Sequence, residues 1–139
     1  MALRTGIDIV EIGRLEEINP AIRARFIERV FTPLEQQLAR GSYPSLAGRF
    51  AAKEAVSKAL GTGIGKVSWR DIEIARGPAG EPVLQLHGRA REVAERLGLL
   101  EWSVSISHGR SHAVAVAVAI GPQTETAPDG LGKPMGPRE

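Results

Sequence analysis

The 139-residue sequence has no cysteine, few aromatic residues and no long apolar run. Without cysteine there is no disulfide, thiolate ligand or thiol nucleophile, so any metal would need oxygen or imidazole ligands. Aromatic residues make up only 4% of the chain, which argues against stacking on nucleic-acid bases. No apolar run reaches the roughly 18 residues of a membrane span, and a signal-peptide pattern is missing. We therefore expect a cytoplasmic protein.

The composition that remains is typical of one globular domain, with 42% hydrophobic and 24% charged residues. A formal net charge of +2 suits an anionic ligand or an acidic protein partner better than a long nucleic acid. From residue 121 onward the chain is rich in proline, glycine and threonine. We predict a folded domain over 1–120 and a disordered tail over 121–139.

Residues 45–60 predict the central helix, with Ser45 as N-cap and Gly61 just past the C-terminal end. One half of this helix is mostly alanine, which would allow another element to approach closely. The other half is polar and consists of Arg49, Lys53, Glu54, Ser57 and Lys58. From spacing alone, Glu54 and Lys58 are best explained as a solvated i,i+4 ion pair.

Asp8 interrupts an apolar stretch around residues 7–12 that is typical of a β-strand. A carboxylate in such a place has to be solvated, paired or bound to a metal. A strand-edge or capping aspartate and a functional aspartate both remain open. After Asn19-Pro20, which predicts a helix start, Arg23 and Arg25 follow with few acids nearby. Together with Arg14 they form either a solvated face or a surface for an acidic partner.

Several further elements follow from turn and capping patterns. Thr32 to Glu35 is a capping box, which gives Glu35 a sufficient structural role. The glycines at 61–65 are explained more simply as a helix terminator than as a ligand loop. Strands are predicted over 67–75 and 83–86, a helix over 90–97, and a hairpin over 101–107 and 113–120.

The hairpin alternates large apolar residues with alanine or serine, so we expect its small face to pack on the alanine-rich helix. The fold predicted from these elements is α+β, a single domain with a largely antiparallel sheet around the central helix. His108 and Arg110 lie on the hairpin loop, where they could hold a phosphate or simply form an exposed turn.

Five separated motifs, taken together, resemble the holo-[acyl-carrier-protein] synthases, the short bacterial class of the 4′-phosphopantetheinyl transferase superfamily. They occur in the family's order across residues 3–120. The motifs are GIDI at 6–9, Phe31-Thr32 with Glu35, RFAAKEA at 49–55 with Lys58, Trp69 with Asp71-Ile72, and SISH at 105–108.

The resemblance implies transfer of 4′-phosphopantetheine from coenzyme A to a serine of apo acyl carrier protein, with release of adenosine 3′,5′-bisphosphate. It also implies Mg²⁺ as cofactor, a role in fatty acid biosynthesis, and a homotrimer whose active sites are shared between subunits. No nucleic-acid or membrane partner is implied. A non-catalytic binding module and a metal-dependent phosphohydrolase on the same residues are the alternatives.

The resemblance also assigns residues. Asp8 and Glu54 match the metal ligands and, with Lys58, the catalytic residues. The coenzyme A contacts implied are Arg49, Phe50, Lys58, Gly61, Gly63 and His108. Arg14, Arg23 and Arg25 match the region that meets the carrier protein. Many relatives have an acidic or hydroxyl residue after the histidine, whereas Gly109 has no side chain.

Overall fold

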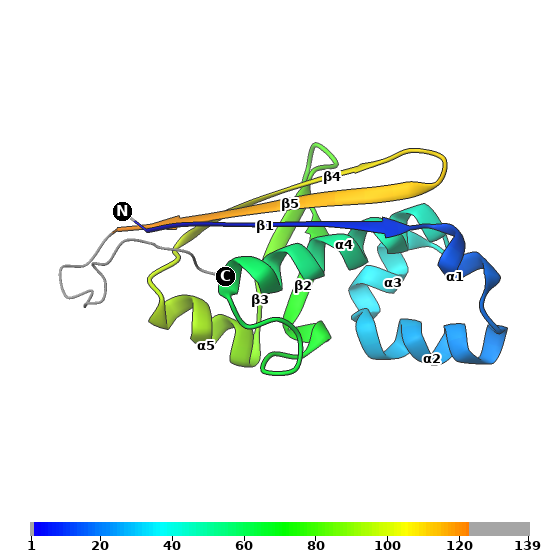
Figure 1. The fold of residues 1–139 in the computed structure, drawn as a ribbon, viewed down its shortest axis with the longest axis horizontal. Coiled ribbons are helices and arrows are strands. Elements are labelled where there is room, and N and C mark those ends of the chain that lie inside the picture. The colour runs from blue at the N-terminus through cyan, green and yellow to red at the C-terminus, as the bar shows by residue number, and fades with distance from the viewer. Residues whose placement is uncertain (1, 123–139) are drawn as a thin grey trace.

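The structure, a computed structural model, describes residues 2–122 (Figure 1). Its elements in chain order are β1 (Ala2–Glu11), α1 (Gly13–Glu17), α2 (Pro20–Val30), α3 (Pro33–Ala39), α4 (Tyr43–Leu60), the 3₁₀ turn η1 (Trp69–Asp71), β2 (Ile72–Arg76), β3 (Pro82–Leu86), α5 (Gly88–Arg96), β4 (Glu101–His108) and β5 (His112–Gly121). Gly121 thus closes β5, and the rest of the predicted tail, apart from Pro122, lies outside the described residues.

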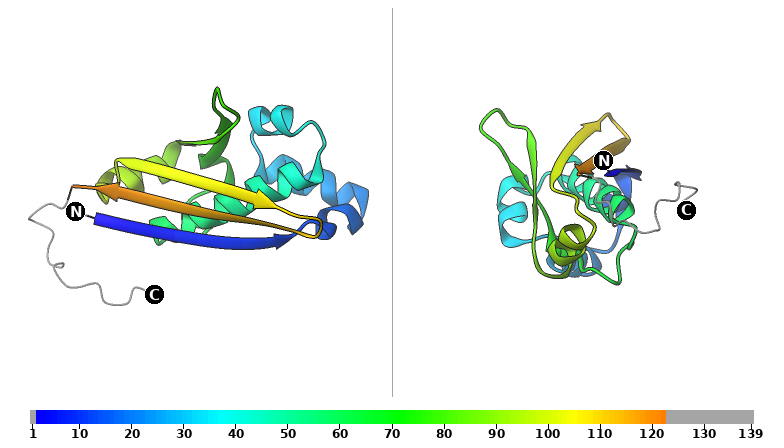
Figure 2. Two further views of the ribbon diagram at one scale, coloured as in Figure 1. Left: turned by 90° about the horizontal axis from the view of Figure 1, so that it is seen from above. Right: turned by 90° about the vertical axis from the view of Figure 1, so that its left-hand side faces the viewer.

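The long helix α4 lies between two antiparallel sheets. A three-stranded sheet of order β1-β5-β4 covers one side, while the β2-β3 hairpin, α3 and α5 pack on other sides of the helix (Figures 1 and 2). The predicted α+β fold with a central alanine-rich helix is confirmed. Within the described part of the chain, no helix is long and apolar enough to cross a lipid bilayer.

The ends of α4 are set by local capping. The helix begins at Tyr43, earlier than predicted, because the Ser42 side chain accepts a hydrogen bond from the Ser45 backbone N–H and Pro44 occupies the first turn. Gly61 ends it as predicted, in the left-handed conformation with φ of 80°. The strand expected from residue 67 starts only at Ile72, because η1 precedes it.

The polar half of α4 is less exposed than predicted. The exposed fractions are 7% for Arg49 and 0% for Lys53 and Ser57. The prediction failed because the periodicity of one helix assigns charged residues to solvent, whereas α4 is packed against β2, α3 and α5 as well as against the sheet. Only the part of the polar half near Glu54 and Lys58 stays partly open.

Charged side chains form hydrogen bonds with backbone groups of β2 that β3 does not pair. Lys53 Nζ lies 2.7 Å from Glu35 Oε1 and donates to the Ile72 carbonyl. Glu35 Oε2 accepts from the Ile74 N–H at 2.6 Å, and Arg49 Nε donates to the Ile74 carbonyl at 3.0 Å. The buried charges therefore satisfy the backbone polar groups of β2. The capping box predicted for Glu35 is also present.

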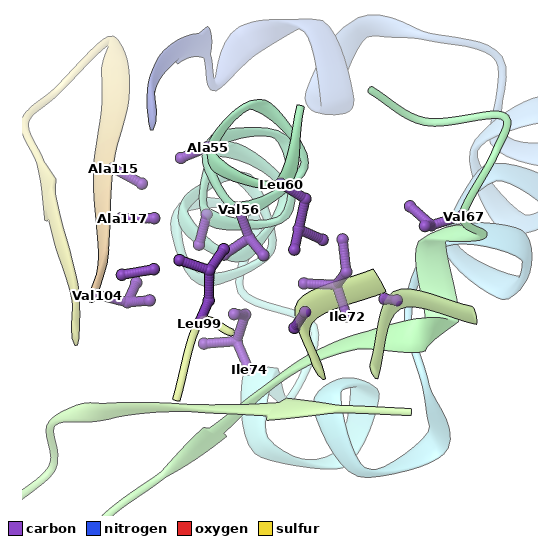
Figure 3. Packing of buried hydrophobic residues seen from close by; sticks show 14 of the residues in the cluster. Ala55, Val56, Leu60, Val67, Ile72, Ile74, Leu99, Val104, Ala115 and Ala117 are labelled. Atoms are coloured by element: carbon purple, nitrogen blue, oxygen red, sulfur yellow. The ribbon is translucent and has the colours of Figure 1, made fainter. Parts of the chain in front are cut away.

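The main core lies between α4 and both sheets (Figure 3). The alanines of β5 face α4, as predicted, but the inner face of β4 carries Trp102, Val104 and Ile106 instead of its serines. The β4–β5 register explains the difference, since Val104 pairs with Ala117. A large residue beside each small one fills the layer that alanine alone would leave hollow.

Gly6 allows β1 to lie directly on α4. A Cβ atom at this position would stand 1.9 Å from the Ala55 carbonyl oxygen, a separation that no side chain can occupy. We predict that Gly6→Ala lowers the free energy of unfolding by about 3 kcal/mol, the upper end for overpacked cores, as measured by urea denaturation. Gly13→Ala, which meets only a flexible glutamate end at 3.5 Å, is the control. Equal stability of both variants would contradict the close approach.

Candidate active site

The close approach of β1 and α4 brings two functional candidates together. Asp8 lies on the same face of β1 as Gly6, and Lys58 lies near the end of α4. Lys58 Nζ donates to the Ile7 carbonyl at 2.9 Å and lies 3.3 Å from Asp8 Oδ1. The ion pair of Lys58 in the structure is therefore with Asp8, across the two elements, rather than the predicted pair with Glu54.

Asp8, Glu54 and Lys58 line one cavity of about 770 Å³. Its other lining residues are Ile9, Val10, Glu11, Arg14, Leu15, Ile18, Phe26, Phe50 and His112. The cavity thus combines three carboxylates, Asp8, Glu11 and Glu54, and two cations, Arg14 and Lys58, with an apolar wall from α1, α2 and α4. Such a combination can hold a charged reacting group beside an uncharged chain.

A second cavity, of about 800 Å³, lies beyond Lys58 toward the start of β1. Its lining consists of Leu3, Arg4, Thr5, Lys58, Leu60, Gly61, Thr62 and Gly63. Lys58 therefore borders both cavities. Two cations and a glycine-containing turn make the second cavity suited to an anion.

Glu54 has a pKa above its ordinary value. Partial burial is the main cause, the negative charge of Asp8 adds to it, and Lys58 opposes it. Two carboxylates close enough to repel each other are stabilised by a cation between them.

Among the described residues, no group of three or more histidine, aspartate or glutamate side chains could hold a metal. Mg²⁺ fits the smaller set of Asp8 and Glu54, because it commonly binds one or two carboxylates and takes its other ligands from substrate phosphates and water.

The raised pKa gives a prediction for stability. A carboxyl group whose pKa is higher in the folded state stabilises the fold at pH below its unfolded pKa, and this contribution is lost as pH rises through the folded pKa. Ionised Glu54 therefore destabilises the metal-free protein at pH 7. We expect Glu54→Gln to raise the thermal midpoint in EDTA at pH 7, and the gain to shrink as pH falls toward 4.

Glu92→Gln serves as the control for this prediction, because Glu92 is an exposed glutamate on α5. Its substitution should leave the midpoint nearly unchanged in EDTA. A lower midpoint for Glu54→Gln at pH 7 would show that Glu54 stabilises the fold by some other contact.

Comparison with known proteins identifies the family. The model of the 4′-phosphopantetheinyl transferase superfamily matches residues 4–117. The chain belongs to this superfamily.

Curated holo-[acyl-carrier-protein] synthases from Moorella thermoacetica and Gloeobacter violaceus are 50% and 48% identical to it over 119 and 122 residues. These matches cover 84% and 85% of this chain and 92% of each relative. The crystal structure of Helicobacter pylori holo-[acyl-carrier-protein] synthase in complex with coenzyme A superposes with a TM-score of 0.76 at 39% identity. It covers 84% of this chain and 99% of that one. The resemblance inferred from the sequence motifs is confirmed.

Not every residue that the superfamily motifs suggest for coenzyme A lies at these cavities. Phe50 lines the first cavity, stacked on Trp69 with ring centroids 4.9 Å apart. Gly61 and Gly63 line the second. In the described chain, Arg49 lines neither cavity, because its side chain is buried against β2. Burial also lowers the pKa of its guanidinium. The assignment of Arg49 to coenzyme A therefore lacks support within one subunit.

The structure places the two histidines of the β4–β5 hairpin in different surroundings. His108 is exposed at the end of β4 and borders neither cavity, whereas His112 lines the first one. Pattern reading missed His112, which pairs in register with Glu11 on β1 and follows Ser111, whose Oγ lies 2.8 Å from His112 Nδ1. Only the register of the two strands could have revealed it.

The arginines expected to meet the carrier protein differ in their surroundings. Arg14 lines the first cavity and Arg25 is exposed on α2. Arg23 donates to the carbonyls of Leu15 and Ile18 at 3.3 Å each, so it connects α1 to α2. Its position allows a structural role besides any contact with a partner.

Proposed function

We propose that this protein transfers the 4′-phosphopantetheine group of coenzyme A to a serine hydroxyl of apo acyl carrier protein and releases adenosine 3′,5′-bisphosphate. The observation that carries the proposal is the meeting of Asp8, Glu54 and Lys58, from β1 and α4, on one cavity. The 50% identity to the holo-[acyl-carrier-protein] synthase of Moorella thermoacetica supports the same reaction.

The reaction needs a proton acceptor and stabilisation of negative charge. The serine oxygen bonds to the phosphorus that bears pantetheine, and the bond from that phosphorus to the bridging oxygen breaks. The leaving adenosine bisphosphate keeps the bridging oxygen and its electron pair. Asp8 or Glu54 is the candidate to accept the serine proton, and Lys58 neutralises charge on the phosphates. Bound Mg²⁺, held by Asp8 and Glu54, would supply further neutralisation of that charge.

The two cavities could bind different parts of coenzyme A, the phosphopantetheine donor. The phosphates would lie beside Lys58, with the nucleotide in the second cavity near Gly61 and Gly63. The uncharged pantetheine arm would extend along Phe50 and Phe26, whose ring centroids lie 5.4 Å apart in the first cavity. The proposal places the acceptor serine where the two cavities meet.

An acidic carrier protein would approach over α1 and α2. Arg14 and Arg25 are exposed there, and Arg29 adds positive charge along α2. Complementary charge of this kind mainly raises the association rate and weakens with salt. We also propose that this protein is cytoplasmic and that it supplies modified carrier protein for fatty acid biosynthesis.

The outer face of the β1-β5-β4 sheet supports assembly into a homotrimer. Among residues 2–122 no helix lies over this face, and it exposes 63% of Leu3, 59% of Ile7, 64% of Ile9 and 37% of Val116 (Figure 2). A row of large apolar side chains on an uncovered sheet is typical of an interface. Light scattering should give three times the chain mass, and Ile7→Glu should reduce it. A monomeric mass for the unaltered chain would contradict this assembly.

Intact mass spectrometry tests the proposed reaction. Incubation with Mg²⁺, coenzyme A and an apo acyl carrier protein should add about 340 Da, the mass of the phosphopantetheine group, to the carrier. A carrier that is bound but never modified would favour a non-catalytic module. Release of adenosine 3′,5′-bisphosphate without any acceptor would favour a phosphohydrolase.

A further inference from the structure

Arg4 is a cation of the second cavity that neither the capping patterns nor the family motifs single out. It lies on the same face of β1 as Gly6 and Asp8. Its Nη1 donates to the Ala59 carbonyl at 3.0 Å and would lie 3.2 Å from a Cβ atom at Gly61. The guanidinium is thus held beside the turn that ends α4.

The surroundings of Arg4 are those of an anion site. Lys58 borders the same cavity, so two positive side chains face one space of about 800 Å³. Thr62 also lines this cavity, and within residues 2–122 its buried hydroxyl oxygen has no hydrogen-bond partner. A phosphate could accept from the guanidinium, the ammonium and the hydroxyl together.

Two positive side chains, Arg4 and Lys58, are available along β1 for a ligand with phosphates at two places. Arg4 and Asp8 are four residues apart, which is about 13 Å in an extended strand. Lys58 contacts Asp8 and also reaches the cavity of Arg4. Coenzyme A carries a diphosphate and, across its ribose, a separate 3′-phosphate. With the diphosphate beside Lys58, a second cation further along the strand lies toward the nucleotide end.

We propose that Arg4 binds a phosphate of the donor nucleotide and is a specificity-determining residue for coenzyme A. The inference rests on the transferase function proposed above. Arg4 acts on binding of the donor and not on the bond-breaking step. It lines the second cavity, whereas Asp8 and Glu54 line the first, and Lys58 lies between them. Loss of Arg4 should therefore raise the KM for coenzyme A and leave kcat and the KM for the carrier nearly unchanged.

Steady-state kinetics of Arg4→Gln and Arg4→Lys test the proposal. We expect the KM for coenzyme A to rise about 10-fold in Arg4→Gln, and less in Arg4→Lys, which keeps the charge. The same measurements with 3′-dephospho-coenzyme A separate the two phosphates. If the defect disappears with this donor, Arg4 binds the 3′-phosphate, and if it persists, Arg4 binds the phosphate at the nucleotide end of the diphosphate.

Arg76→Gln is the matched control, because Arg76 also donates to a helix carbonyl, that of Leu38 at 3.3 Å, but borders neither cavity. Its KM for coenzyme A should not change. Calorimetric titration of adenosine 3′,5′-bisphosphate into each variant gives a second measure, and should show the same loss for Arg4→Gln. If Arg4→Gln does not fold, the comparison uses Arg4→Lys and Thr62→Val, each expected to raise the KM by a few-fold.

An unchanged KM and unchanged bisphosphate binding in Arg4→Gln would overturn the proposal while leaving the transferase function intact. A defect confined to kcat would overturn it too, since it would place Arg4 in the chemical step. Failure of the unaltered chain to modify any carrier would instead overturn the proposed function itself.

Discussion

Asp8→Ala should lower the rate of phosphopantetheine transfer about 1000-fold, which corresponds to about 4 kcal/mol of lost transition-state stabilisation. Asp8 is one of only two carboxylates that we assign to the cation, and it is also the ion-pair partner of Lys58 at 3.3 Å. Its loss would remove a ligand of the metal ion and would free the Lys58 side chain from its position. The measurement is the initial rate of carrier modification at saturating coenzyme A.

Asp8→Ala should leave the fold almost unchanged, because an ion pair with Lys58 half exposed contributes little to stability. Glu11→Ala is a matched control, since Glu11 lies on the same strand and lines the same cavity but has no assigned role in the reaction. Its rate should stay within a few-fold of the unaltered chain. Normal transfer by Asp8→Ala at low Mg²⁺ would show that the metal assignment is wrong.

Lys53→Met should lower the free energy of unfolding by about 3–5 kcal/mol, because it leaves the Glu35 carboxylate buried without its partner. Both side chains are completely buried, 2.7 Å apart. Burial lowers the pKa of Lys53, while Glu35 opposes the shift. The substitution also removes a donor to the Ile72 carbonyl, so β2 loses part of its attachment to α4.

Urea denaturation of Lys53→Met, Glu35→Gln and the double variant measures this pair. We expect the double variant to be less destabilised than the sum of the single ones, because no unpaired charge remains. Arg89→Met, at an exposed arginine of α5 paired with Glu92, is the control and should change stability by less than about 1 kcal/mol. Additive effects at residues 35 and 53 would contradict a direct ion pair.

The parts of the fold that depend on neighbouring residues were predictable from the sequence. Asn19 caps α2, the Thr32–Glu35 capping box begins α3, and Gly61 ends α4, as their local patterns indicated. The short helix α1 was missed because Gly13–Glu17 is too brief to show periodicity. Local hydrogen bonds within three or four residues fix these features, so one stretch of sequence contains the information.

The burial of Lys53 and Arg49 could not be predicted in the same way. Their partners, Glu35 and the carbonyls of β2, lie up to 25 residues away in the chain. Helical periodicity shows which side chains of one helix share a face. It cannot show that the β2-β3 hairpin packs on the polar side of α4. Tertiary packing converted side chains that look solvated into the connection between α4 and β2.

The residues of the candidate site also divide into those that the sequence indicated and those that only tertiary packing revealed. Asp8, Glu54 and Lys58 were found through family motifs, and the structure brings them to one cavity. Arg4 and His112 were not found, since their places depend on how β1 lies on α4 and pairs with β5. Two-residue alternation along β1 does put Arg4 on the face of Asp8, but it gives no reason to choose Arg4 without the cavity.

Binding of Mn²⁺, followed by electron paramagnetic resonance as a substitute for Mg²⁺, tests the central claim that Asp8 and Glu54 hold one cation beside the donor phosphates. The unaltered chain should bind one Mn²⁺ per subunit, more tightly when adenosine 3′,5′-bisphosphate is present. Asp8→Ala and Glu54→Gln should each weaken that binding at least about 10-fold, while Glu11→Ala should not. Equal Mn²⁺ affinity in all four proteins would contradict the account.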